Sequence, residues 1–142
     1  MNEWLLDVNV LLGCAWKSHA DHTALLSWLL SANSWATCPL VESGFVRISM
    51  TTAYQAPFED ARRSLATLRA LAGHRFVTDD VEAASLPKFT SYKDTTDAHL
   101  VTLAKRHGLK LATLDDGLIG KPWAVGIAEN PLLSPKPSST NG

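Results

Sequence analysis

Short apolar runs alternate with amphipathic stretches along most of this chain, and this alternation restricts its fold more than any other feature. We expect strands at residues 4–6, 35–38, 75–77 and 109–114, with a short fifth at 124–127. The stretches between them predict helices at residues 8–16, 19–32, 40–48, 59–71 and 95–107. This order predicts an α/β fold with helices layered on a central, mainly parallel sheet.

Length and charge restrict the number of domains and the way in which this chain could bind nucleic acid. A chain of 142 residues with 46% hydrophobic residues is long enough for one domain with its own core. We expect that domain at residues 1–133 and a disordered C-terminal tail at 134–142, which has no apolar residue to bury. The 13 basic and 14 acidic residues give a net charge of −1, which excludes a protein that binds nucleic acid by bulk charge alone.

The cysteines and the N-terminal residues predict a location. Cys14 and Cys38 form neither a disulfide framework nor a CxxC zinc motif, so we expect two buried thiols in a reducing compartment. Asp7 interrupts the first apolar run after three residues, which is not typical of a signal peptide. No apolar run approaches the length of a membrane span. These features predict a cytoplasmic protein.

Four acidic residues occupy related places in the expected sheet. Asp7 and Asp115 directly follow strands, while Glu42 and Asp97 lie in the first turns of helices. In a parallel sheet these places share the edge where the strands end, so the four carboxylates would lie close together and repel one another. A divalent cation with oxygen ligands relieves that repulsion and is suited to hydrolysing phosphodiester bonds.

Each acid also has an alternative interpretation. Asp7 and Asp115 can be helix caps, and Asp97 can stabilise the first turn of its helix through the helix dipole. Glu42 can project outward from an otherwise apolar segment. Only the coincidence of all four at one sheet edge favours a metal site.

Three segments carrying these acids resemble the motifs of one family. Residues 5–12 (LLDVNVLL), 38–48 (CPLVESGFVRI) and 95–118 (TTDAHLVTLAKRHGLKLATLDDGL) resemble, in order, motifs of PIN-domain ribonucleases, specifically the VapC-type toxins of type II toxin–antitoxin systems. The likeness extends from residue 4 to about residue 127. It implies a PIN-like three-layer α/β/α sandwich with a central sheet of four to five strands.

The resemblance also implies site residues, a cofactor and partners. It implies an endoribonuclease that uses Mg²⁺, with Mn²⁺ as a possible substitute, to activate a water that attacks RNA. It further implies a VapB-type antitoxin and a homodimer. The catalytic, metal-binding acids would be Asp7, Glu42, Asp97 and Asp115, with Asn9, Thr113 and Asp116 as accessory residues. Asp115 fits the family's T-x-D pattern better than Asp116.

Histidine, basic and tryptophan residues form three further groups of candidates. The His19, Asp21 and His22 cluster is more typical of a helix start than of a metal site. Candidate contacts to RNA phosphates are Arg47, Lys93 and the group Arg62, Arg63 and Arg69. Most of the five tryptophans should be core, although one or two can serve a dimer interface or an antitoxin groove.

Competing functions differ in which acids they need. Asn9 stands where a haloacid-dehalogenase-like phosphatase needs an aspartate, and a receiver domain needs an acidic pair after the first strand. An RNA-processing nuclease and a catalytically silent PIN-like binding module stay open as alternatives.

Overall fold

The computed structural model describes residues 2–133, and both Met1 and the expected tail at 134–142 lie outside the described residues. Its five strands form one sheet in the order β3-β2-β1-β4-β5, and every neighbouring pair is parallel. The strands are β1 (Trp4–Leu6), β2 (Trp35–Thr37), β3 (His74–Phe76), β4 (Lys110–Ala112) and β5 (Ala128–Glu129).

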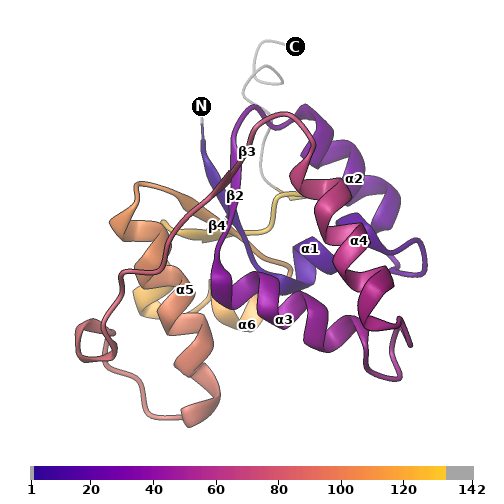
Figure 1. Ribbon diagram of the computed structural model, residues 1–142. Coiled ribbons are helices and arrows are strands. Elements are labelled where there is room, and N and C mark those ends of the chain that lie inside the picture. The colour runs from indigo at the N-terminus through magenta and orange to yellow at the C-terminus, as the bar shows by residue number, and fades with distance from the viewer. Residues whose placement is uncertain (1, 134–142) are drawn as a thin grey trace.

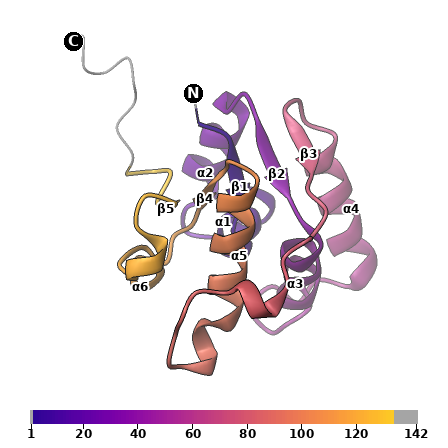
Figure 2. The same cartoon turned by 90° about the vertical axis from the view of Figure 1, so that its left-hand side faces the viewer.

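Helices cover both faces of this sheet. They are α1 (Val8–Ala15), α2 (His22–Ser31), α3 (Pro39–Ser49), α4 (Phe58–Arg69), α5 (Thr95–Arg106) and the short α6 (Asp116–Ile119). Figure 1 shows α5 on one side of the sheet and α1, α2 and α4 on the other, and Figure 2 views the α5 side directly. The predicted three-layer sandwich with a central parallel sheet is confirmed.

The apolar strands explain why the sheet lies in the middle. All three residues of β1 are buried, as are all three of β2, because helices exclude water from both faces of the central strands. Trp35 and Leu111 are among the fully buried side chains of the core. No helix within residues 2–133 is both long and apolar enough to cross a membrane.

Two predicted elements differ from the structure by more than a shift of one or two residues at an end. The fifth strand was expected at 124–127, but Pro122–Ala124 forms a 3₁₀ helix, Gly126 has a φ of +82°, and the strand is Ala128–Glu129. The second helix begins at His22 rather than at residue 19, because residues 16–22 form turns in which Trp16 and His19 accept backbone hydrogen bonds of 3.1 Å. The two-residue strand β5 is too short to produce an apolar pattern in the sequence. The start of α2 was misplaced because turns can form where the first turn of a helix is expected.

Candidate active site

Asp7 lies at the centre of the sheet's carboxyl edge, where β1 ends and α1 begins. Its Oδ1 caps α1 by accepting a 2.7 Å hydrogen bond from the Val8 amide. Its Oδ2 accepts a 2.7 Å hydrogen bond from the hydroxyl of Thr113, which directly follows the neighbouring strand β4. With 7% of its surface exposed, Asp7 is buried and its carboxylate orientation is fixed from two sides.

The Thr113 hydroxyl connects two side chains and one backbone amide of this edge. Besides donating to Asp7, its oxygen accepts hydrogen bonds from Asn9 Nδ2 at 3.3 Å and from the Asp115 amide at 3.1 Å. Asn9 Oδ1 in turn accepts from the Leu114 amide at 3.2 Å. Since a hydroxyl has one proton and two lone pairs, the hydrogen-bonding capacity of Thr113 is fully used. The structure thus brings Asn9 and Thr113 to Asp7.

Asp115 follows Thr113 and caps the short helix α6. Its Oδ1 accepts a 3.1 Å hydrogen bond from the Leu118 amide, and the residue is exposed. The Asp115 charge raises the pKa of both Asp7 and Asp97, so Asp115 lies within electrostatic reach of both. Asp116 is exposed in the first turn of α6, and the charges acting on those two aspartates do not include it.

Asp97 carries the clearest electrostatic signature of the site. Burial, the charges of Asp7 and Asp115, and then that of Asp94 raise its pKa to about 6, against a smaller lowering by Lys121. Burial also raises the pKa of Asp7, and the hydrogen bonds from Thr113 and Val8 only partly offset this effect. Three aspartates from three segments therefore share a region in which the effect of negative charge on Asp97 outweighs that of Lys121.

Glu42 has different partners from the three aspartates. On α3, it receives a 3.0 Å ion pair from Arg69 at Oε1 and a 2.6 Å hydrogen bond from the Thr37 hydroxyl at Oε2. Thr37 also lies 2.7 Å from His74 Nε2, and because its proton points to Glu42, the histidine is the donor. Both oxygens of Glu42 are thus engaged one strand away from Asp7.

Sequence reasoning missed two residues of this site, Thr37 and His74. It named Arg69 only as one of several candidate contacts to RNA phosphates. Burial, and secondarily the charge of Arg69, lowers the pKa of His74, while Glu42 acts in the opposite direction. One signal was present: Thr37 and Thr113 are each the next-to-last residue of a predicted strand, and each gives its hydroxyl proton to a carboxylate.

The donor set fits a hard divalent cation, although its ligands are not assembled around one point. Among residues 2–133, no three histidine, cysteine, aspartate or glutamate side chains are grouped closely enough to hold an ion directly. The oxygens of Asp7, Asp97 and Asp115 are nonetheless the kind that Mg²⁺ and Mn²⁺ prefer, and Mg²⁺ often keeps several waters while binding one or two carboxylates. The raised pKa of Asp97 marks a place where a cation is favoured.

The other candidate groups have structural roles. His22 Nδ1 lies 2.8 Å from the Gly13 carbonyl, and His19 Nδ1 accepts from the Asp21 amide at 3.0 Å, so this cluster organises the start of α2. Both cysteines are buried and unpaired, as predicted, and burial raises the pKa of the Cys14 thiol to about 12.

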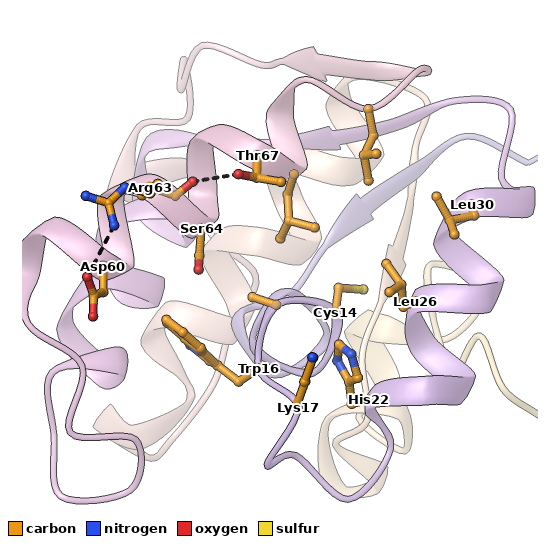
Figure 3. Close-up of a pocket in the computed structure, with 13 residues that line it drawn as sticks. Cys14, Trp16, Lys17, His22, Leu26, Leu30, Asp60, Arg63, Ser64 and Thr67 are labelled. Carbon is orange, nitrogen blue, oxygen red and sulfur yellow. Dashed lines mark hydrogen bonds and ion pairs between the residues drawn. The ribbon is translucent and has the colours of Figure 1, made fainter.

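A separate apolar groove lies between the end of α1, α2 and α4, on the side of the sheet away from α5 (Figure 3). It has a volume of about 700 Å³, and Leu30, at its rim, is 63% exposed. Trp16 also lines this groove, and its indole nitrogen donates a 2.9 Å hydrogen bond to Ser49. One of the tryptophans thus has a face toward a surface groove rather than the core alone.

Comparison with known proteins agrees with this arrangement. A family model described as PIN domain matches residues 4–122. Ribonuclease VapC38 of Mycobacterium tuberculosis (strain ATCC 25618 / H37Rv) is 48% identical over 123 residues, covering 80% of this chain and 86% of the relative. Ribonuclease VapC39 of the same strain is 39% identical over 135 residues, covering 88% and 96%.

A solved structure shows the same fold at low sequence identity. The crystal structure of VapBC2 from Rickettsia felis bound to a DNA fragment from their promoter superposes with a TM-score of 0.61 at 14% identity. The match covers 90% of this chain and 98% of that chain. With its parallel sheet, its carboxylates at the strand ends and its close sequence relatives, the chain belongs to the PIN-domain family and, within it, to the VapC-type ribonucleases.

Proposed function

We propose that this protein is the endoribonuclease toxin of a toxin–antitoxin pair and that it hydrolyses RNA phosphodiester bonds with Mg²⁺ at the carboxyl edge of its sheet. The observation that carries the proposal is the convergence of Asp7, Asp97 and Asp115: burial, together with the charges of Asp7 and Asp115, raises the pKa of Asp97 to about 6. A cation that neutralises such a cluster reduces its repulsion of an anionic substrate. Names of the close relatives, ribonucleases VapC38 and VapC39, support the reaction class.

The roles of the chain's own residues follow from their contacts. Asp7 and Asp97 would hold the cation, and Asp115 would complete the acidic set. Thr113 and Asn9 keep the Asp7 carboxylate in place through their hydrogen bonds. Glu42 is the fourth acid of the proposal and is oriented by Thr37 and Arg69. When bound, Mg²⁺ or Mn²⁺ supplies an activated water and stabilises charge on the phosphate.

Cleavage of RNA tests this proposal directly. We expect the purified protein to cut single-stranded RNA with Mg²⁺, leaving 5′-phosphate and 3′-hydroxyl ends, and to be inactive in excess EDTA. Asp7→Asn and Asp115→Asn should reduce cleavage to background while circular dichroism shows an intact fold. Full activity in EDTA would refute the metal mechanism. A wild-type protein that binds RNA and Mg²⁺ without cleaving would instead favour the silent binding module.

The apolar groove supports a proposal for the antitoxin. We propose that a VapB-type antitoxin packs an apolar segment into the groove between α1, α2 and α4, where Trp16 and Leu30 are available. Exposed apolar surface of this kind is typical of protein interaction sites. The protein encoded by a small reading frame beside the toxin gene should bind the wild type and bind Leu30→Asp at least about tenfold more weakly. The homodimer that the family resemblance implies is a separate matter and stays a prediction.

A further inference from the structure

The arginines of α4 differ in what they contact. Arg62 pairs with Glu59 at 2.8 Å and Arg63 pairs with Asp60 at 3.6 Å, each one turn earlier on the same exposed helix face. Arg69, the last residue of α4, instead reaches Glu42 on α3 at 3.0 Å. Of these arginines, Arg69 is therefore the one that brings a positive charge to the acidic edge of the sheet.

The guanidinium of Arg69 is held in one orientation. Its Nη1 donates to Glu42, and its central carbon lies 4.9 Å from the centre of the Phe76 ring on β3. A cation over an aromatic face is stabilised by the ring electrons, and the flat guanidinium suits this stacking better than an ammonium does. The side chain is still 41% exposed, so a fixed guanidinium with five N–H donors faces solvent in part.

Arg69 also lies at a useful place relative to the aspartates. Its partner Glu42 is hydrogen-bonded to Thr37 at the end of β2, and β2 is the direct neighbour of β1, which ends at Asp7. Neighbouring strands lie about 4.8 Å apart, so the Arg69 group flanks the acidic centre on the β2–β3 side. On the α5 side, the cation that acts on Asp97 is Lys121, which is paired with Asp94 at 3.3 Å.

We propose that Arg69 is a substrate-binding residue that contacts an RNA phosphate next to the scissile one. The inference rests on the proposed function, because it takes single-stranded RNA as the substrate and the three aspartates as the place of cleavage. A charged guanidinium forms strong, often bidentate hydrogen bonds with phosphate oxygens. Contact with a flanking phosphate would fix the direction in which the strand crosses the acidic centre, and it would also compensate for the repulsion between RNA and carboxylates.

The experiment measures RNA binding in EDTA, so that the wild-type chain binds without cleaving. Fluorescence anisotropy of a fluorescein-labelled single-stranded oligoribonucleotide gives Kd between 50 and 200 mM KCl, a range of about fourfold in salt. We expect Arg69→Gln to raise Kd about fivefold to tenfold at the lowest salt. Loss of one phosphate contact should also reduce the slope of log Kd against log salt by about 0.7. Arg63→Gln, on the same helix with a local partner, is the matched control and should change Kd less than about twofold.

A purely structural role for Arg69 gives a different result. If Arg69→Gln lowers the melting temperature but leaves Kd and the salt slope unchanged, or if Arg63→Gln has the same effect on binding, the proposal is overturned. Arg69→Lys keeps the charge and should retain most of the slope while binding more weakly than the wild type, because an ammonium lacks the planar fork.

The outcomes also separate this inference from the proposed function. Cleavage by the wild type together with unchanged RNA binding by Arg69→Gln overturns only the role of Arg69. RNA binding that depends on Arg69, without cleavage in Mg²⁺, supports the contact and refutes the nuclease. A wild-type chain that binds no RNA at any salt concentration in EDTA and cleaves none in Mg²⁺ overturns both.

Discussion

Replacing Asp97 with asparagine should make the metal-free protein more stable, although Asp97 belongs to the proposed site. The pKa of its carboxyl rises from an ordinary 3.8 to about 6, chiefly through burial and then through Asp7 and Asp115. A raised pKa in a folded acid means that the folded state disfavours the ionised form. Ionised Asp97 therefore costs stability at neutral pH, and Asp97→Asn removes that cost.

The size of the effect follows from the pKa. A shift of one pKa unit corresponds to about 1.4 kcal/mol, so a rise of roughly two units gives at most about 3 kcal/mol. Asp97 is only partly buried, and solvent screening reduces the expected gain to about 1–2 kcal/mol. Between pH 3.8 and about 6 the folded state holds more protons than the unfolded state, so wild-type stability falls as pH rises through this window. The gain from Asp97→Asn should thus be about half as large at pH 5 as at pH 7.5.

Urea denaturation followed by tryptophan fluorescence measures this gain. In EDTA at pH 7.5, the midpoint of Asp97→Asn should lie about 0.5–1 M urea above that of the wild type, given the usual dependence of unfolding free energy on urea. Asp116→Asn, an exposed carboxylate beside the site, is the control and should change stability by less than about 0.5 kcal/mol. Adding Mg²⁺ should stabilise the wild type more than Asp97→Asn, because only the complete site binds the cation tightly. An Asp97→Asn protein that is no more stable in EDTA, or whose gain is the same at pH 5 and pH 7.5, would refute the reasoning.

Other substitutions test the parts of the fold around the site. Thr113→Val removes the hydroxyl that serves Asp7, Asn9 and the Asp115 amide, so it should cost about 1–3 kcal/mol in urea denaturation and reduce RNA cleavage, while Thr113→Ser retains both. Gly73→Ala places a Cβ 2.7 Å from the Asn33 carbonyl oxygen at a φ of +90°, and it should destabilise the protein more than Gly108→Ala, where φ is +70° and no atom lies within 4 Å. Cys14 and Cys38 should react with Ellman's reagent only after unfolding, because burial raises the pKa of both thiols, and rapid labelling of the folded protein would contradict their burial.

The positions of the aspartates could be predicted from the sequence because they depend on local pattern and on one topological rule. Apolar runs that end in Asp7 and before Asp115 identify strand ends, and parallel topology brings strand ends to one edge. The position of Asp97 in the first turn of a helix follows from the clear apolar periodicity of that helix. None of these steps requires knowledge of which helix packs against which.

The contacts of Glu42 could not be predicted without knowing which helices pack against each other. The Arg69–Glu42 pair joins residues 27 positions apart on α3 and α4, and it exists because these helices pack side by side. Three arginines in an amphipathic helix look alike in sequence, yet Arg62 and Arg63 pair locally while the end of the helix places Arg69 against α3. Interhelical packing is decided by side-chain fit across elements, which periodicity does not encode.

The order of the strands also explains why the acids of this edge are unequal. β1 lies at the centre of the sheet with a strand on each side, so the residue that ends it, Asp7, is buried and needs two hydrogen bonds to remain well placed. Asp115 follows the next strand outward and is exposed to solvent. Under the proposed function, the cation would be held closest to buried Asp7 and half-buried Asp97, and substrate phosphate would approach from the exposed side. The strand order therefore divides the acids of this edge into an inner, more buried group and an outer, exposed one.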